Sequence, residues 1–225
     1  MSISLNPQPR QLDSALVHAL RRVSFPTIGH FLETGFVDPA ICTMTPGLTF
    51  VGRAVTVRIA SPDGLLLHRV MAQVEPGDVV VVDTGSDRTH AVVGAVIATA
   101  AQAAGAAGFV VDGVVTDVLD LREMAIPVFA RATSVLTAKL IGIDDGGINV
   151  PVACGGVTVH PGDAVMADEN GVLVLDPQVA AGVVEQARRS DEAEPELLAA
   201  IRSGGSLATL GKSDELLASM GYPAS

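Results

Sequence analysis

The sequence predicts an α/β fold built as a layered αββα sandwich. Between residues 50 and 130, short apolar runs typical of buried strands alternate with segments of helical spacing. A second run of short β segments follows between residues 148 and 175. Such an order of elements indicates a layered sandwich of helices and sheets. Small aliphatic side chains dominate the hydrophobic fraction of 48%, and only 3% of the residues are aromatic, which suits closely packed layers.

Periodicity divides the first half of the chain into helices and buried strands. Apolar residues that recur every three to four positions indicate helices, whereas alternating or short continuous apolar runs indicate strands. The predicted elements are, in order, helices at residues 12–23 and 25–36, a strand at 50–59, a helix at 63–74 and a strand at 79–83.

The second half begins with an alanine-rich helix that Gly94 opens. Polar or glycine-rich loops separate the elements that follow it. These are a strand at 108–111, a helix at 117–124, strands at 127–130, 148–152, 157–159, 164–167 and 172–175, and a charged helix at 177–202. No repeat or linker divides residues 1–202, so we predict one domain there, followed by a Gly/Ser linker and a short helical tail at 203–225.

Charge and hydropathy narrow the classes of partner. With 25 acidic and 14 basic residues, the net charge of −11 argues against nucleic acid, because such binding rests on clustered Lys and Arg. A basic protein partner stays open. The chain shows neither an apolar run long enough for a membrane span nor the pattern of a signal peptide. Cys42 and Cys154 have no metal-like spacing and need not pair, so we expect a protein of the reducing cytoplasm.

The stretch from Gly94 to Asp120 carries the strongest local signal for a functional site. Its strand delivers Asp112 and Asp117 to its far end, and ligands of α/β domains bind where strands end and helices begin. One interpretation is a small metal-dependent site. The other is that Asp112 belongs to an Asp-Gly turn and that Asp117 caps the next helix. The local sequence leaves both interpretations open.

Five motifs along the chain carry a family resemblance. They are PGDVVVVDTGSD at residues 76–87, the Gly94 helix, VVDGVVTD at 110–117, IPVFARATS at 126–134 and INVPVACGGVTVHPGDAVMADENGV at 148–172. From about residue 15 to about residue 190 the chain resembles the RraA-like family, the relatives of regulator of ribonuclease activity A. That family includes metal-dependent class II aldolases acting on 4-hydroxy-4-methyl-2-oxoglutarate and 4-carboxy-4-hydroxy-2-oxoadipate. The resemblance implies the swivelling β/β/α arrangement of phosphohistidine domains.

The resemblance also implies a reaction, the retro-aldol cleavage of a 2-oxo acid with release of pyruvate. Its hard step is the stabilisation of the pyruvate enolate, for which a divalent ion acts as a Lewis acid. Mg²⁺ and Mn²⁺ suit a site with few carboxylates. The family's metal aspartate falls on Asp117, and the acidic residue that follows it falls on Asp120. Thr116 stands where the aldolases have Arg, so one neutral hydroxyl replaces a charged fork.

A second departure from the family lies at the start of the alanine-rich helix. Ala95 replaces an acidic residue that the aldolases use for proton handling and metal hydration. The N–H groups of Ala95, Val96 and Ile97, which follow Gly94, still offer a cradle for a substrate carboxylate. The two departures indicate a different substrate, substitution by other side chains, or loss of catalysis.

Side chains near the cradle are candidates for such a substitution. His90 is the histidine best placed to move protons near neutral pH, and Arg88 is a candidate for the missing cation. The structural alternatives are a surface or helix-capping histidine and a solvated loop charge. Arg131 follows a strand and is expected either to reach the cleft or to serve in an ion pair.

The expected function is therefore that of a divalent-metal-dependent lyase that cleaves or decarboxylates a small 2-oxo acid, in the manner of a class II aldolase or an oxaloacetate decarboxylase. The alternative is a non-catalytic, protein-binding regulator that has lost aldolase activity. The resemblance further implies a homo-oligomer, a trimer or hexamer, with sites between adjacent subunits. An apolar set in the C-terminal stretch is expected to lie across a neighbour or to pack on its own core. Its members are Leu197, Leu198, Ile201, Leu207 and Leu210.

Overall fold

A large mixed sheet organises the protein and confirms the predicted α/β class. The structure is a computed structural model and describes residues 2–222. Its strands are β1 (Ser4–Leu5), β2 (Cys42–Thr43), β3 (Phe50–Ile59), β4 (Asp78–Asp83), β5 (Gly108–Val115), β6 (Val128–Thr133), β7 (Gly146–Ile148), β8 (Val152–Cys154), β9 (Val157–Val159), β10 (Ala164–Asp168) and β11 (Gly171–Leu175). Within the described residues, nine of these form one sheet in the order β1-β7-β3-β4-β5-β6-β2, with β10 paired to β3 and β11 to β10. β8 and β9 pair only with each other.

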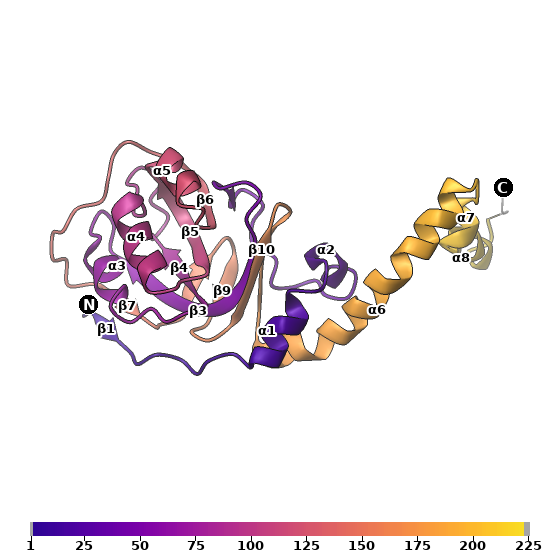
Figure 1. Ribbon diagram of the computed structural model, residues 1–225, viewed down its shortest axis with the longest axis horizontal. Helices are drawn as coiled ribbons and strands as arrows, with labels where there is room; N and C mark the ends of the chain where they lie inside the picture. Colours follow the sequence, from indigo (N-terminus) through magenta and orange to yellow (C-terminus); the bar gives the residue numbers. More distant parts are fainter. Residues whose placement is uncertain (1, 223–225) are drawn as a thin grey trace.

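Helices cover this β structure in two groups (Figure 1). The helices are α1 (Ser14–Leu20), α2 (Phe25–Ile28), α3 (Leu65–Val70), α4 (Ala95–Ala103), α5 (Val118–Glu123), α6 (Pro177–Arg202), α7 (Leu207–Leu210) and α8 (Ser213–Ser219). α3, α4 and α5 pack on one face of the central strands, and β8 to β11 cover the other face. α1, α2 and the first turns of α6 pack on the far side of β10 and β11.

The parallel strands β3, β4, β5 and β6 form the middle of the sheet. Their short apolar runs are buried on both faces. In β4, Val80 and Val82 contact the helical layer, whereas Val79 and Val81 contact the β8–β11 layer. Because the four strands run in the same direction, their carboxyl ends share one edge of the sheet. The loops that follow β4 and β5 therefore meet there.

The predicted helix at 25–36 is wrong beyond its first turn. α2 ends at Ile28, and Phe36 instead forms a bridge with Leu173 of β11. Gly35 has φ +92°, and a side chain there would place its Cβ 2.3 Å from the Val174 carbonyl oxygen. The segment therefore turns back to join β11, which helical spacing alone does not reveal.

Two strand predictions also need correction. β5 continues through Asp112 to Val115, with a register shift between Val111 and Val114, so the interpretation of Asp112 as part of an Asp-Gly turn is wrong. The predicted strand at 148–152 is divided between β7 and β8, because the chain bends at Asn149, which has φ 52°.

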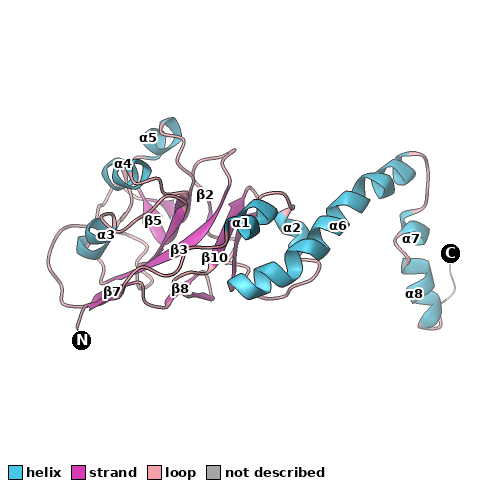
Figure 2. Cartoon of the chain, turned by 60° about the horizontal axis from the view of Figure 1, so that its bottom comes forward, coloured by secondary structure: helices cyan, strands magenta, loops and turns pink. Residues whose placement is uncertain are grey.

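The C-terminal helices extend away from the sheet. Ala180, Val183 and Ala187, all in the first half of α6, are the residues of this helix that are buried. The second half projects from the body and carries α7 and α8 at its end (Figure 2). No helix among the described residues combines the length and the apolar character needed to cross a bilayer.

Candidate functional site

The candidate site lies beyond the end of β5, where three backbone segments run side by side. Residues 91–93 pair with the end of β5 through hydrogen bonds of 3.2 and 2.9 Å, and with residues 136–138 through two of 2.7 and 2.8 Å. The bridges on both sides are parallel. The chain therefore leaves this pairing with Gly94, which begins α4, beside Thr116 and Asp117.

Gly94 permits an unusually close approach between the two segments. A Cβ atom on Gly94 would lie 2.5 Å from Asp117 Oδ2 and 2.7 Å from Thr116 Cγ2. Any other residue would push these side chains away. The absence of a side chain at Gly94 thus lets the Asp117 carboxylate reach the first turn of α4.

Asp117 is held in a conformation that few residues other than glycine adopt, with φ 54° and ψ 38°. It occupies the N-cap position of α5, yet its side chain makes no capping bond to α5. Asp117 Oδ2 instead accepts the Ala95 N–H at 2.9 Å, at the amino end of α4. The Thr116 hydroxyl donates a longer bond of 3.3 Å to Oδ1. A left-handed aspartate at a helix end is a local strain that often marks a functional site.

The amino end of α4 keeps part of the predicted carboxylate cradle free. Asp117 already takes the amide of Ala95. Within the described part of the chain, the amides of Val96 and Ile97 have no hydrogen-bond acceptor. Because these amides lie at the positive end of the helix, they suit an incoming anion.

Asp117 and Asp120 are the carboxylates near this helix end that could hold a divalent cation. Asp120 lies in the first turn of α5, close in sequence to Asp117. The described residues contain no group of three or more His, Cys, Asp or Glu that could hold a metal ion. Two carboxylates nevertheless suit Mg²⁺ or Mn²⁺, since these ions keep several water ligands. Apart from the long bond to Thr116, Asp117 Oδ1 remains available for such an ion.

The structure does not join His90 to this cluster. His90 Nδ1 lies 2.7 Å from Asp87 Oδ2, and no hydrogen bond of the described residues links His90 to Thr116 or Asp117. Burial acts to raise the pKa of Asp87, but hydrogen bonds from Ser61, Thr89 and His90 outweigh it and hold this pKa well below its usual range. Asp87 is therefore an anion beside the imidazole.

Arg88 and Arg131 are both held by Asp112. The Arg88 guanidinium donates to the carbonyl and the carboxylate of Asp112, each at 2.9 Å, and Arg131 Nε donates to the same carboxylate at 2.6 Å. Arg131 also binds Asp38 at 2.7 Å, so the ion-pair role is the one that the structure shows. Asp112 and Asp117 thus serve different clusters.

This second cluster fastens the β8–β9 hairpin to the sheet. Asp112 accepts the Gly155 N–H of that hairpin at 2.7 Å. Burial alone would raise the pKa of Asp112, but the bonds from Arg131 and Gly155 and the charges of Arg131 and Arg88 lower it. Sequence reasoning missed Asp38 and Asp87. Each of them binds a side chain that the sequence did indicate as a candidate, Arg131 for Asp38 and His90 for Asp87. Only Asp87 lies close to its partner in the sequence, which is the signal that could have revealed it.

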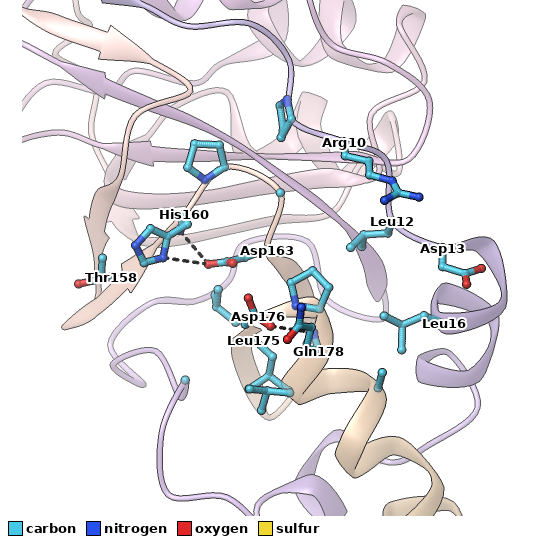
Figure 3. Close-up of a pocket in the computed structure, with 18 of the residues that line it drawn as sticks. Arg10, Leu12, Asp13, Leu16, Thr158, His160, Asp163, Leu175, Asp176 and Gln178 are labelled. Atoms are coloured by element: carbon cyan, nitrogen blue, oxygen red, sulfur yellow. Dashed lines mark hydrogen bonds and ion pairs between the residues drawn. The ribbon is translucent and has the colours of Figure 1, made fainter.

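A separate cavity of about 1400 Å³ lies far from α4 along the chain, between the N-terminal segment, the β9–β10 turn and the start of α6. Figure 3 shows His160 and Asp163 on one side of it and Arg10 and Asp13 on the other. Asp163 accepts the His160 N–H at 2.7 Å, and burial raises the pKa of Asp163. None of the residues that line this cavity belongs to the predicted site.

The site thus combines the free amides at the amino end of α4 with the Asp117 carboxylate, on a layered α/β scaffold. The profile of the RraA-like family, described as Aldolase/RraA, matches residues 28–174. The chain therefore belongs to the RraA-like family.

Individual relatives agree with this assignment. A Halalkalibacterium halodurans protein with the provisional name 4-hydroxy-4-methyl-2-oxoglutarate aldolase is 40% identical over 62% of this chain and 65% of its own length, just under two thirds. The Thermus thermophilus protein named 4-hydroxy-4-methyl-2-oxoglutarate aldolase is 37% identical over 60% of this chain and 79% of its own. A solved Streptomyces coelicolor structure, described as an unusual member of the RNase ES inhibitor RraA family, is 28% identical with a TM-score of 0.72, and the match covers 85% of this chain and 100% of that one.

Proposed function

We propose that this protein is a divalent-metal-dependent lyase that cleaves or decarboxylates a small 2-oxo acid through a pyruvate enolate. The observation that carries the proposal is the Asp117 carboxylate, held at 2.9 Å against the first amide of α4 and beside two free amides. Such a site offers anion-binding amides and cation-binding oxygens side by side, which is what a metal-bound keto acid requires. The aldolase names of the two relatives support the same class.

In this proposal, each group at the site has a separate role. The amides of Val96 and Ile97 bind the substrate carboxylate at the amino end of α4. The Thr116 hydroxyl exchanges its long bond to Asp117 for one neutral hydrogen bond to the keto acid. Asp117 and Asp120 would hold Mg²⁺ or Mn²⁺, which when bound supplies Lewis-acid stabilisation of the enolate oxygen.

His90 and Arg88 complete the proposed site from the loop before α4. His90 carries the proton, because Ala95 has no acidic group to do so. Arg88 contributes positive charge near the carboxyl ends of β4 and β5 while Asp112 holds its guanidinium in place. We also propose that the protein acts in the cytoplasm as a homo-oligomer, a trimer or a hexamer.

The second candidate function is a protein-binding regulator without catalysis. Thr116 and Ala95 favour it, because both lack the charge that the family's aldolases carry at these positions. The description of the Streptomyces coelicolor relative as a member of an RNase inhibitor family supports the same alternative.

A pyruvate-release assay with and without chelator separates the two candidates. Its substrates are oxaloacetate, 4-hydroxy-4-methyl-2-oxoglutarate and 4-carboxy-4-hydroxy-2-oxoadipate. The lyase predicts release that depends on Mg²⁺ or Mn²⁺ with at least one of them. No release from any substrate at saturating metal would favour the regulator.

Calorimetry with Mg²⁺ and Mn²⁺ tests the metal site directly. We expect Asp117→Asn to weaken binding at least about tenfold, because loss of a charged ligand removes most of the attraction for a hard cation. Glu123→Gln is the matched control, since Glu123 is an exposed acid at the other end of α5. Equal metal affinity in both variants would show that Asp117 is not the anchor.

A further inference from the structure

We propose that Asp87 is a positioning residue that holds His90 as the proton carrier of the site, with the ring hydrogen on Nδ1 and the free electron pair on Nε2. The catalytic consequence rests on the lyase proposed above. The geometry rests on one loop, residues 84–94, which leads from β4 to α4.

Asp87 is the acceptor at the centre of this loop. Its carboxylate accepts the Thr89 N–H and the Thr89 hydroxyl, each at 2.7 Å, and the His90 N–H at 3.2 Å. The Ser61 hydroxyl, from the segment after β3, donates to Oδ2. These bonds leave the carboxylate little freedom to turn. His90 Nδ1 therefore meets an acceptor that is fixed in place.

These contacts decide which nitrogen of the ring carries the hydrogen. Asp87 Oδ2 lies 2.7 Å from His90 Nδ1, and an anionic oxygen at that distance requires a donor. Thr89 Oγ1, at 3.0 Å from Nδ1, already donates its only hydrogen to Asp87 and is left to accept. The neutral ring thus has its hydrogen on Nδ1 and its electron pair on Nε2.

The loop is also tied to β5, the strand that ends just before Thr116 and Asp117. The Ser134 hydroxyl donates to the Thr89 carbonyl at 2.6 Å, and the Ser134 N–H donates to the Val115 carbonyl at 2.9 Å. The His90 side chain is 26% exposed, and within the described residues its Nε2 has no hydrogen-bond partner. A fixed imidazole with an open Nε2 therefore sits at the edge of the sheet where the candidate site lies.

In the proposed aldol step, His90 is the only group that carries a proton. Nε2 takes the proton of the substrate's 4-hydroxyl group as the bond between C3 and C4 breaks. The electron pair of that bond passes to C3 and the 2-oxo group, which leaves the pyruvate enolate and a carbonyl product. The imidazolium, stabilised by Asp87, then returns the proton to C3 and completes pyruvate.

The chain contains a matched comparison for this pair. His160 and Asp163 have the same sequence separation as Asp87 and His90, but their Nδ1–Oδ2 distance is 3.7 Å and the His160 side chain is 62% exposed. We expect His160 to show no fixed ring hydrogen. Asp163→Asn is the control variant for Asp87→Asn.

Nitrogen-15 NMR of the histidine rings in the free protein tests the positioning. His90→Gln assigns the His90 signals among the five histidines. At a pH high enough for the histidine rings to be neutral, we expect the wild-type His90 ring to carry its hydrogen on Nδ1. The His90 ring of Asp87→Asn should lose this preference, and that of Asp163→Asn should keep it. A wild-type His90 with its hydrogen on Nε2 would overturn the proposal.

Kinetics test the catalytic consequence. We expect His90→Gln to lower kcat about 10²–10⁴-fold, and Asp87→Asn to lower it at least about tenfold with KM nearly unchanged and with a wild-type circular dichroism spectrum. An unchanged kcat in an Asp87→Asn protein whose ring hydrogen has moved would refute the proton-carrier role. If the wild type releases no pyruvate from any substrate, the proposed lyase and the proton-carrier role both fail, while NMR still decides the positioning.

Discussion

Gly94 lets the Asp117 side chain approach α4 because glycine has no side chain of its own. Because the atoms nearest to a Cβ there belong to the Asp117 and Thr116 side chains, we expect these side chains to move rather than the backbone. Gly94→Ala should therefore weaken Mg²⁺ and Mn²⁺ binding in calorimetry, at a cost in unfolding free energy of about 1 kcal/mol.

Gly182→Ala serves as the control for this change. Gly182 lies inside α6 with open space around it, so alanine should stabilise the protein by about 0.5–1 kcal/mol and leave metal binding unaltered. Urea unfolding of both variants checks the contrast. If Gly94→Ala binds metal like the wild type, the close approach has no functional role.

Thr116 and Ala95 set the expected level of activity. The loss of a donor to developing negative charge typically costs on the order of 10²–10³ in rate, so we expect weak or absent turnover of the family's aldol substrates. The double change Thr116→Arg with Ala95→Glu should raise it. An ordinary enzyme turns over on the order of 10 s⁻¹. A wild-type turnover of that size would contradict this expectation.

At the scale of elements, the Asp112 cluster joins parts of the chain that are remote in sequence. Asp112 of β5 binds Arg131 of β6, the loop residue Arg88 and the N–H of Gly155 in the β8–β9 hairpin. With the Asp112 side chain 13% exposed, we expect Asp112→Asn to destabilise the protein by about 2–3 kcal/mol at pH 7, because Arg131 loses one of its two charged partners and keeps only Asp38.

The pH dependence of this loss checks its electrostatic origin. The pKa of Asp112 is lowered in the folded state, so its contribution is complete above the unfolded value of about 4 and disappears as the pH falls through the lower folded value. In urea unfolding, the difference between wild type and Asp112→Asn should shrink below pH 4. A difference that stays constant there would mean that lost packing, not charge, is the cause.

At the scale of the whole molecule, the exposed apolar side chains indicate assembly. Leu207, Leu216 and Met220 in the C-terminal helices are 61–64% exposed, and Val96 and Leu119 near the candidate site are exposed as well. Apolar side chains gathered in this way on a projecting arm and around a site are typical of interfaces. The alternative of a C-terminal helix packed on its own core does not hold for Leu207, Leu216 and Met220.

We therefore predict a closed trimer or its doubled form, in which a second subunit completes the Gly94–Asp117 cleft. Light scattering at micromolar concentration should give at least three times the 23.0 kDa mass of the chain. Truncation after Arg202 is expected to weaken the assembly, because it removes α7 and α8. A monomer at this concentration would refute both the assembly and the shared site.

The sequence by itself determined the α/β class, the central strands and the place where α4 begins. These features depend on local periodicity and on glycine, which act within a few residues. It also predicted Asp117, Thr116 and Gly94 as members of one site, through the family motifs that these residues match. The family membership rested on the same order of motifs.

Only the tertiary structure decided which groups the polar side chains bind. Asp117 turns to α4 rather than α5 because residues 91–93 pair with the end of β5, and Asp112 turns to Arg131 because its position in β5 points it away from α4. The partners of Asp112 are 19 to 43 residues away in sequence, and a hydrogen bond has no sequence signal over that distance. The strand pairing that brings such groups together is set by the packing of the whole sheet.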